Sequence, residues 1–132
     1  MIRMKLLFIV TLFFSLFGTA RAQSVAELEK MITVKQWSIT GDKQAGIGRH
    51  NSMNENSRLT FSTDSTWECT DPILGENKGR WYIKDSKSLY LSPGKSKKAV
   101  KCDLILLSEN QLQFKYKQNT AVRTLEWESV ED

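Results

Sequence analysis

Residues 58–93 read RLTFSTDSTWECTDPILGENKGRWYIKDSKSLYLSP, and this stretch decides the expected fold because its apolar and polar residues alternate in short runs. Successive side chains of a β-strand point to opposite faces of the sheet, so each run predicts a half-buried strand. Polar turn residues separate the runs, which favours antiparallel strands joined in chain order. The apolar positions that share the inner face are Leu59, Phe61, Trp67, Cys69, Trp81, Ile83, Leu89 and Leu91.

The same alternation continues on both sides of this stretch, at residues 34–40, 99–107, 111–117 and 120–129. About eight strands in a sequential meander would leave two exposed edges unless the sheet closed on itself. The sequence therefore predicts an all-β, up-and-down antiparallel barrel, with a flattened sandwich as the alternative. A short helix is expected before it at residues 24–33, because Ser24 and Glu27 have capping-box spacing and apolar residues follow at helical intervals.

The N-terminus has the three parts of a secretory signal: Arg3 and Lys5, an apolar run over residues 6–17, and small residues at Ala20 and Ala22. The run is too short to span a hydrocarbon core of ~30 Å. We therefore expect residues 1–22 to be a signal peptide and residues 23–132 to form a single domain. The mature protein would be periplasmic or secreted, with no membrane span.

Removal of the signal changes the charge of the chain. The full sequence has 19 Lys and Arg against 15 Asp and Glu, and Arg3, Lys5 and Arg21 leave with the signal, so the mature domain carries +1. This near-neutral charge argues against a nucleic-acid partner.

Alternate connections of a meander lie at the same end, so those at 41–56, 71–78, 93–98 and 118–119 would form the mouth of the barrel. Long loops on a rigid scaffold often carry binding sites. The aromatic lining would be either a ligand cavity or simply a solid core, because barrels of this size do both. A lysine cluster would form either a positive rim for an anionic head group or a solvated hairpin tip. The candidate ligand-binding residues are Trp37, Phe61, Trp67, Trp81, Phe114 and Tyr116 in the lining and Lys95, Lys97 and Lys98 at the rim.

Cys69 and Cys102 are the two cysteines of the chain. An even pair in an exported protein predicts a disulfide, here at the mouth of the barrel, with two buried free thiols as the alternative. No metal-binding or cofactor motif is present in the sequence, and neither group is expected.

The order of these patterns resembles the lipocalin-like domains of small secreted bacterial proteins, within the calycin group. The residues that carry the resemblance are MITVKQWSIT at 31–40, LTFSTDSTWE at 59–68, GRWYIKDSKSLYLS at 79–92 and NQLQFKY at 110–116. The chain departs from longer lipocalins in having Lys35 and Gln36 before Trp37 instead of a GxW triplet. The resemblance implies a small β-barrel that binds small apolar molecules.

Two hypotheses for function follow. The first is an exported, non-enzymatic binding protein that takes a small apolar or amphipathic ligand at the long-loop end. The alternative is a protein-interaction or inhibitor module with a solid core, which binds a protein partner through the same loops. An enzyme is not expected, because nearly every Asp and Glu falls on an outward position or in a turn and His50 has no identified catalytic neighbour.

Overall fold

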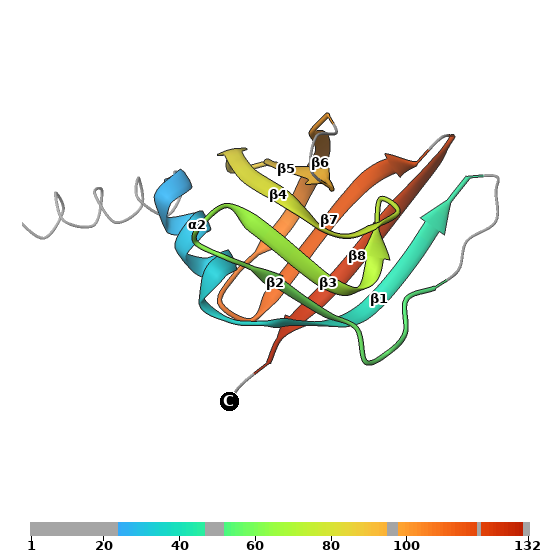
Figure 1. Ribbon diagram of the computed structural model, residues 1–132, viewed down its shortest axis with the longest axis horizontal. Coiled ribbons are helices and arrows are strands. Elements are labelled where there is room, and N and C mark those ends of the chain that lie inside the picture. The colour runs from blue at the N-terminus through green and yellow to red at the C-terminus, as the bar shows by residue number, and fades with distance from the viewer. Residues whose placement is uncertain (1–23, 47–51, 95–97, 119, 131–132) are drawn as a thin grey trace, which may run out of the picture.

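A computed structural model of the chain describes residues 24–46, 52–94, 98–118 and 120–130. Within these residues, one helix is followed by eight strands that close into an antiparallel barrel in chain order, β1-β2-β3-β4-β5-β6-β7-β8, with β8 paired to β1 (Figure 1). The predicted fold is therefore confirmed. The elements are α2 (Val25–Val34), β1 (Trp37–Ala45), β2 (Arg58–Phe61), β3 (Thr66–Ile73), β4 (Glu76–Asp85), β5 (Ser88–Pro93), β6 (Val100–Leu107), β7 (Gln111–Gln118) and β8 (Ala121–Ser129).

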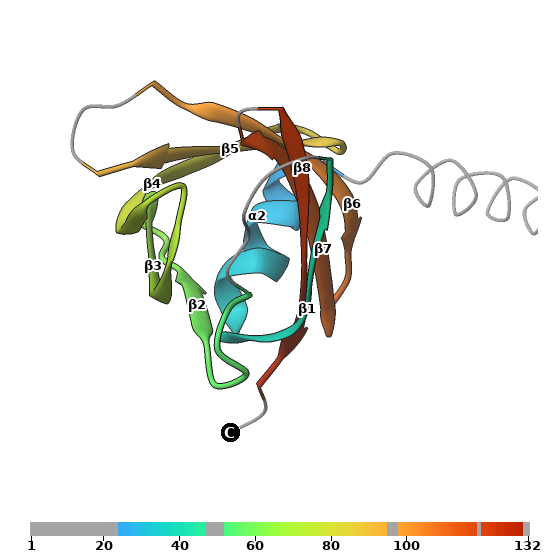
Figure 2. The ribbon, with the colours of Figure 1, turned by 90° about the vertical axis from the view of Figure 1, so that its right-hand side faces the viewer.

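Helix α2 begins and ends where the sequence predicts. The Ser24 hydroxyl accepts a hydrogen bond from the Glu27 amide at 3.2 Å, which caps the first turn. Leu28 and Ile32 are buried, and the helix packs against β2, β4 and β6. The helix covers one end of the barrel, as the view along the ring of strands shows (Figure 2), and we call the opposite end, where β1 ends and β8 begins, the open end.

The hairpin between β3 and β4 differs from the expectation of a long connection over 71–78. β3 continues to Ile73 and β4 begins at Glu76, so the turn consists of Leu74 and Gly75, whose φ angles are +56° and +80°. Two positive φ angles suit a tight hairpin turn. Pro72 is accommodated because the β3–β4 register shifts between Glu68 and Ile73, and proline is tolerated where a ladder is interrupted.

The predicted disulfide is wrong, since Cys69 and Cys102 are both buried free thiols. Cys102 pairs with Leu89 on β5, and Leu89 pairs with Ile83 on β4, so Cys102 is level with Ile83. Glu68 pairs with Lys78, so the next residue of β3, Cys69, is level with Asn77 on β4. Those two levels are six residues apart along β4, or about 20 Å at ~3.4 Å per residue. A disulfide needs Cα atoms within about 7 Å. Cys69 also lies in the middle of β3 instead of at its end, which removes the basis of the sequence argument.

The interior between the helix and the open end is solidly packed. Trp67 and Phe114 are 0% exposed, and Phe61 meets Trp81 edge to face with ring centroids 5.5 Å apart. Among the described residues, the largest side chains with less than 2% exposure are Trp37, Trp67, Trp127, Phe61, Phe114, Ile32, Leu59, Ile73, Leu89, Leu91, Leu112 and Leu125. Such low exposure means that no water-sized space lies against them.

Candidate functional site

The aromatic residues proposed to line a ligand cavity are mostly core residues with their polar atoms satisfied by the protein itself. The indole nitrogen of Trp37 donates to the Ile32 carbonyl at 3.0 Å, which ties helix α2 to β1. Trp67 donates to the Ser92 carbonyl at 3.2 Å and Trp81 to the Ser62 carbonyl at 3.1 Å. These side chains stabilise the barrel by packing and by hydrogen bonds between its elements, and their polar atoms already have protein partners.

Tyr116 is different from the other predicted lining residues. It is only 2% exposed, it lies near the open end of β7, and its hydroxyl makes no hydrogen bond of ordinary geometry with the described residues, although the Arg123 guanidinium lies close enough to lower its pKa. The indole nitrogen of Trp127 is also unpartnered there, but Trp127 pairs with Ile39 and Leu112 toward the helix end. Buried polar groups are nearly always hydrogen-bonded, so an unpartnered hydroxyl near the open end is a candidate site for an ordered water or a ligand.

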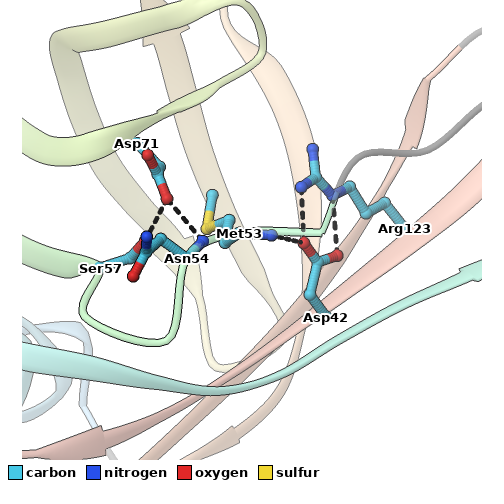
Figure 3. A network of polar contacts seen from close by, with 6 residues as sticks. All are labelled: Asp42, Met53, Asn54, Ser57, Asp71 and Arg123. Atoms are coloured by element: carbon cyan, nitrogen blue, oxygen red, sulfur yellow. Dashed lines mark hydrogen bonds and ion pairs between the residues drawn. The ribbon is translucent and has the colours of Figure 1, made fainter.

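A buried ion pair lies beside Tyr116. Arg123, its cross-strand partner, donates from Nε to Asp42 Oδ1 at 2.9 Å and from Nη2 to Asp42 Oδ2 at 2.7 Å (Figure 3). The side chains of Arg123 and Asp42 are 10% and 4% exposed. A two-point contact between guanidinium and carboxylate is among the strongest protein hydrogen bonds, and here both charges are removed from water.

The electrostatics of this cluster follow from that geometry. The hydrogen bond with Asp42 raises the pKa of Arg123, so the guanidinium stays charged. Burial raises the pKa of the Tyr116 phenol above its ordinary value, and the neighbouring Arg123 offsets only part of this effect. Tyr116 is therefore a neutral hydrogen-bond donor at neutral pH, next to an ion pair whose charges cancel.

Two carboxylates hold the described part of the β1–β2 connection against the barrel. Asp42 Oδ2 accepts from the Met53 amide at 2.8 Å, and Asp71 Oδ2 accepts from the Asn54 amide at 2.7 Å and from the Ser57 hydroxyl (Figure 3). The Ser57 bond, followed by the Asn54 bond, lowers the pKa of Asp71. Residues 53–57 are thereby attached to both β1 and β3.

The predicted lysine rim is only partly described. Lys98 is exposed just before β6, and Lys95 and Lys97 lie outside the described residues, as does the predicted signal peptide at 1–22. No described helix is long and apolar enough to cross a membrane. Within the same residues, no group of three or more His, Cys, Asp or Glu side chains could hold a metal ion.

The sequence argument missed Arg123 and Asp42. Arg123 has the same parity as the inward residues Leu125 and Trp127, so the alternation of β8 could have revealed it. Asp42 could not be found in this way, because the β1 register shifts between Ile39 and Gly41 and turns the following even-numbered positions inward.

Comparison with known proteins does not assign the chain to a family. No protein-family model matches the sequence, and no curated protein is detectably similar to it.

Proposed function

We propose that the protein is an exported, lipocalin-like, non-enzymatic binding protein whose ligand sits at the open end of the barrel. The observation that carries the proposal is the Tyr116 hydroxyl, which is buried, unpartnered among the described residues and next to the Asp42–Arg123 ion pair. The closed eight-stranded meander is the architecture that lipocalin-like proteins use.

The ligand this site fits is small and mostly apolar, with one oxygen that accepts a hydrogen bond from Tyr116. Its apolar part stays near the open end, because the aromatic core beneath is filled. The ion pair is neutral overall, so it favours neither an anionic nor an uncharged head group. The site is therefore shallow, because the low exposure of the aromatic lining favours the solid core over the ligand cavity, the two alternatives that the sequence left open.

Isothermal titration with octan-1-ol and with octanoate tests the proposal. Both are expected to bind, and Tyr116→Phe, which removes only the hydroxyl, is expected to weaken each by about 3–10-fold, the worth of one neutral hydrogen bond. Tyr82→Phe is the matched control, because its hydroxyl lies on the exposed outer face.

Two results would contradict the proposal. One is an absence of binding by both compounds together with no small molecule retained in native mass spectrometry of protein from its own cells. The other is equal affinity of wild type and Tyr116→Phe.

The filled core also supports the alternative function, a module that binds a protein partner. A barrel whose interior is occupied by Trp37, Trp67 and Phe114 must use its loops or its outer surface for recognition.

A further inference from the structure

The outer face of strands β4 to β7 carries an excess of positive charge. Its outward-facing cations come from all the strands of this face except β5, and we call the surface they form the lysine face. They are Lys78, Arg80, Lys84, Lys101, Lys115 and Lys117, whereas the carboxylates on the same strands are Glu76, Asp103 and, at the end of β4, Asp85.

The opposite wall of the barrel lacks this excess. On β1 and β8, the Lys43 ammonium is neutralised by Glu126 at 2.9 Å, and β8 also carries the exposed Glu128. The near-neutral charge of the domain is thus unevenly distributed, with its cations concentrated on one side. Such a patch attracts an oppositely charged partner and speeds its encounter.

Two tyrosines lie in the middle of the lysine face. Tyr82 and Tyr90 are cross-strand partners whose rings stack with centroids 4.7 Å apart and planes 4° from parallel. Tyr82 is 48% exposed, and Lys101 is the next residue in the same row, across from Tyr90. Tyrosine is enriched at protein-binding surfaces, and the surrounding cations would add attraction for an acidic partner.

A groove beside the tyrosines runs between β6 and β7. The β6–β7 ladder ends toward the open end at the pair Asp103 and Lys115, and the strands are unpaired beyond it. The groove has a volume of about 410 Å³. It is lined by Val100, Lys101, Asp103, Lys115, Tyr116, Lys117 and Val122.

We propose that the lysine face binds an extended, acidic segment of a partner protein along the β6–β7 groove. Alternate side chains of an extended chain are about 7 Å apart, which matches the spacing of Lys115 and Lys117 on β7. Val100 and Val122 offer apolar contact to the intervening side chains, and Tyr82 with Tyr90 extends the surface.

The stacked tyrosines favour a peptide over other anionic partners. Each ring covers one face of the other, whereas single-stranded nucleic acid uses free aromatic faces on which successive bases stack. Membrane insertion needs a broad apolar face, and among the described residues of these strands only Tyr82, Ile105 and Leu106 are large, exposed and apolar.

Fluorescence anisotropy with a labelled nonapeptide of alternating Glu and Val tests the proposal, with alternating Lys and Val as the comparison. The acidic peptide is expected to bind, and the double reversal Lys101→Glu with Lys117→Glu is expected to weaken it by at least about tenfold. The matched control is Lys30→Glu with Lys35→Glu, which changes the net charge equally at the exposed Lys30 of helix α2 and the half-buried Lys35 just after it, and is expected to alter affinity by less than about twofold. Circular dichroism verifies that both double variants are folded.

Three outcomes would overturn the proposal. They are equal weakening by the two double variants, no binding of the acidic peptide at low salt, and preference for an oligothymidine or for anionic phosphatidylglycerol vesicles over the peptide. Tyr116 lines the groove as well as the proposed small-ligand site, so the two proposals are distinguished by their probes: none of these outcomes changes the effect expected of Tyr116→Phe on the binding of octan-1-ol and octanoate.

Discussion

The pair of Asp42 and Arg123 shows how one irregular residue changes the chemistry of the barrel. The register shift near Gly41 turns Asp42 inward, where it meets Arg123 from β8. Removing one member of such a pair leaves the other charged, buried and without its partner.

We expect Arg123→Leu to lower the free energy of unfolding by about 3–5 kcal/mol, as measured by urea denaturation. The control Lys43→Ala breaks the exposed bridge to Glu126 and should cost less than about 1 kcal/mol. Asp42→Asn combined with Arg123→Leu should lose less than Arg123→Leu alone, because no charge is left buried. A loss for Arg123→Leu no larger than that of the control would show that the ion pair is unimportant for stability.

At this scale, sequence reasoning identified the buried aromatic residues but not the polar site. Alternation assigns a side chain to a face, so Trp67, Trp81 and Phe114 were placed correctly. It does not reveal which buried polar atoms find partners, and the unpartnered hydroxyl of Tyr116 depends on the geometry of the neighbouring strand.

Among the elements, the hairpin of β4 and β5 depends on a glycine whose role the sequence does not disclose. A Cβ on Gly79 would lie 1.8 Å from the Ser92 carbonyl oxygen and 2.7 Å from the Trp67 indole nitrogen. Gly79 thus permits the Trp67 indole to cross β4 and donate to Ser92 on β5. This close approach joins three consecutive strands.

Gly79→Ala is expected to destabilise the protein by more than about 2 kcal/mol, because the β4–β5 backbone and Trp67 must both move. Thermal unfolding followed by tryptophan fluorescence measures the loss. Gly75→Asn is the control, since no atom lies within 4 Å of a Cβ there and asparagine tolerates the φ of +80°. Equal melting temperatures for the two variants would contradict this account of Gly79.

Element boundaries were predicted less well than element types. The helix and all eight strands were found, because caps and alternation are local signals. β1 and β3 continue beyond their predicted ends. Gly41, Asp71 and Pro72 are typical turn residues, so the local pattern predicts that each strand stops before them. The register shifts that accommodate such residues depend on the neighbouring strands and leave no mark in the local pattern.

At the scale of the whole molecule, the barrel holds its two thiols far from each other and buried away from solvent. Burial raises the pKa of Cys69 to about 11 and that of Cys102 to about 12, so both are neutral thiols at neutral pH. Since the thiolate is the reactive form, both burial and protonation protect them.

We expect iodoacetamide at pH 8 to leave the folded protein unmodified and to add two groups after denaturation, as read by intact mass spectrometry. Reductant should not change the melting temperature. The opposite result would be no label on the denatured, non-reduced protein and two labels after reduction. That result would show that the disulfide exists and would contradict the register of β3 and β6.

The β1–β8 ladder also determines how late during synthesis the barrel can close. The hydrogen bonds between Asp42 and Arg123 join residues 81 positions apart in the chain. At 5–20 residues per second, about 4–16 s separate the synthesis of the two partners. Until β8 emerges, β1 lacks the neighbour with which it makes its longest ladder, and a chain dominated by such distant pairings folds slowly. Under the proposed export, this delay would keep the nascent chain open until its last strand is made.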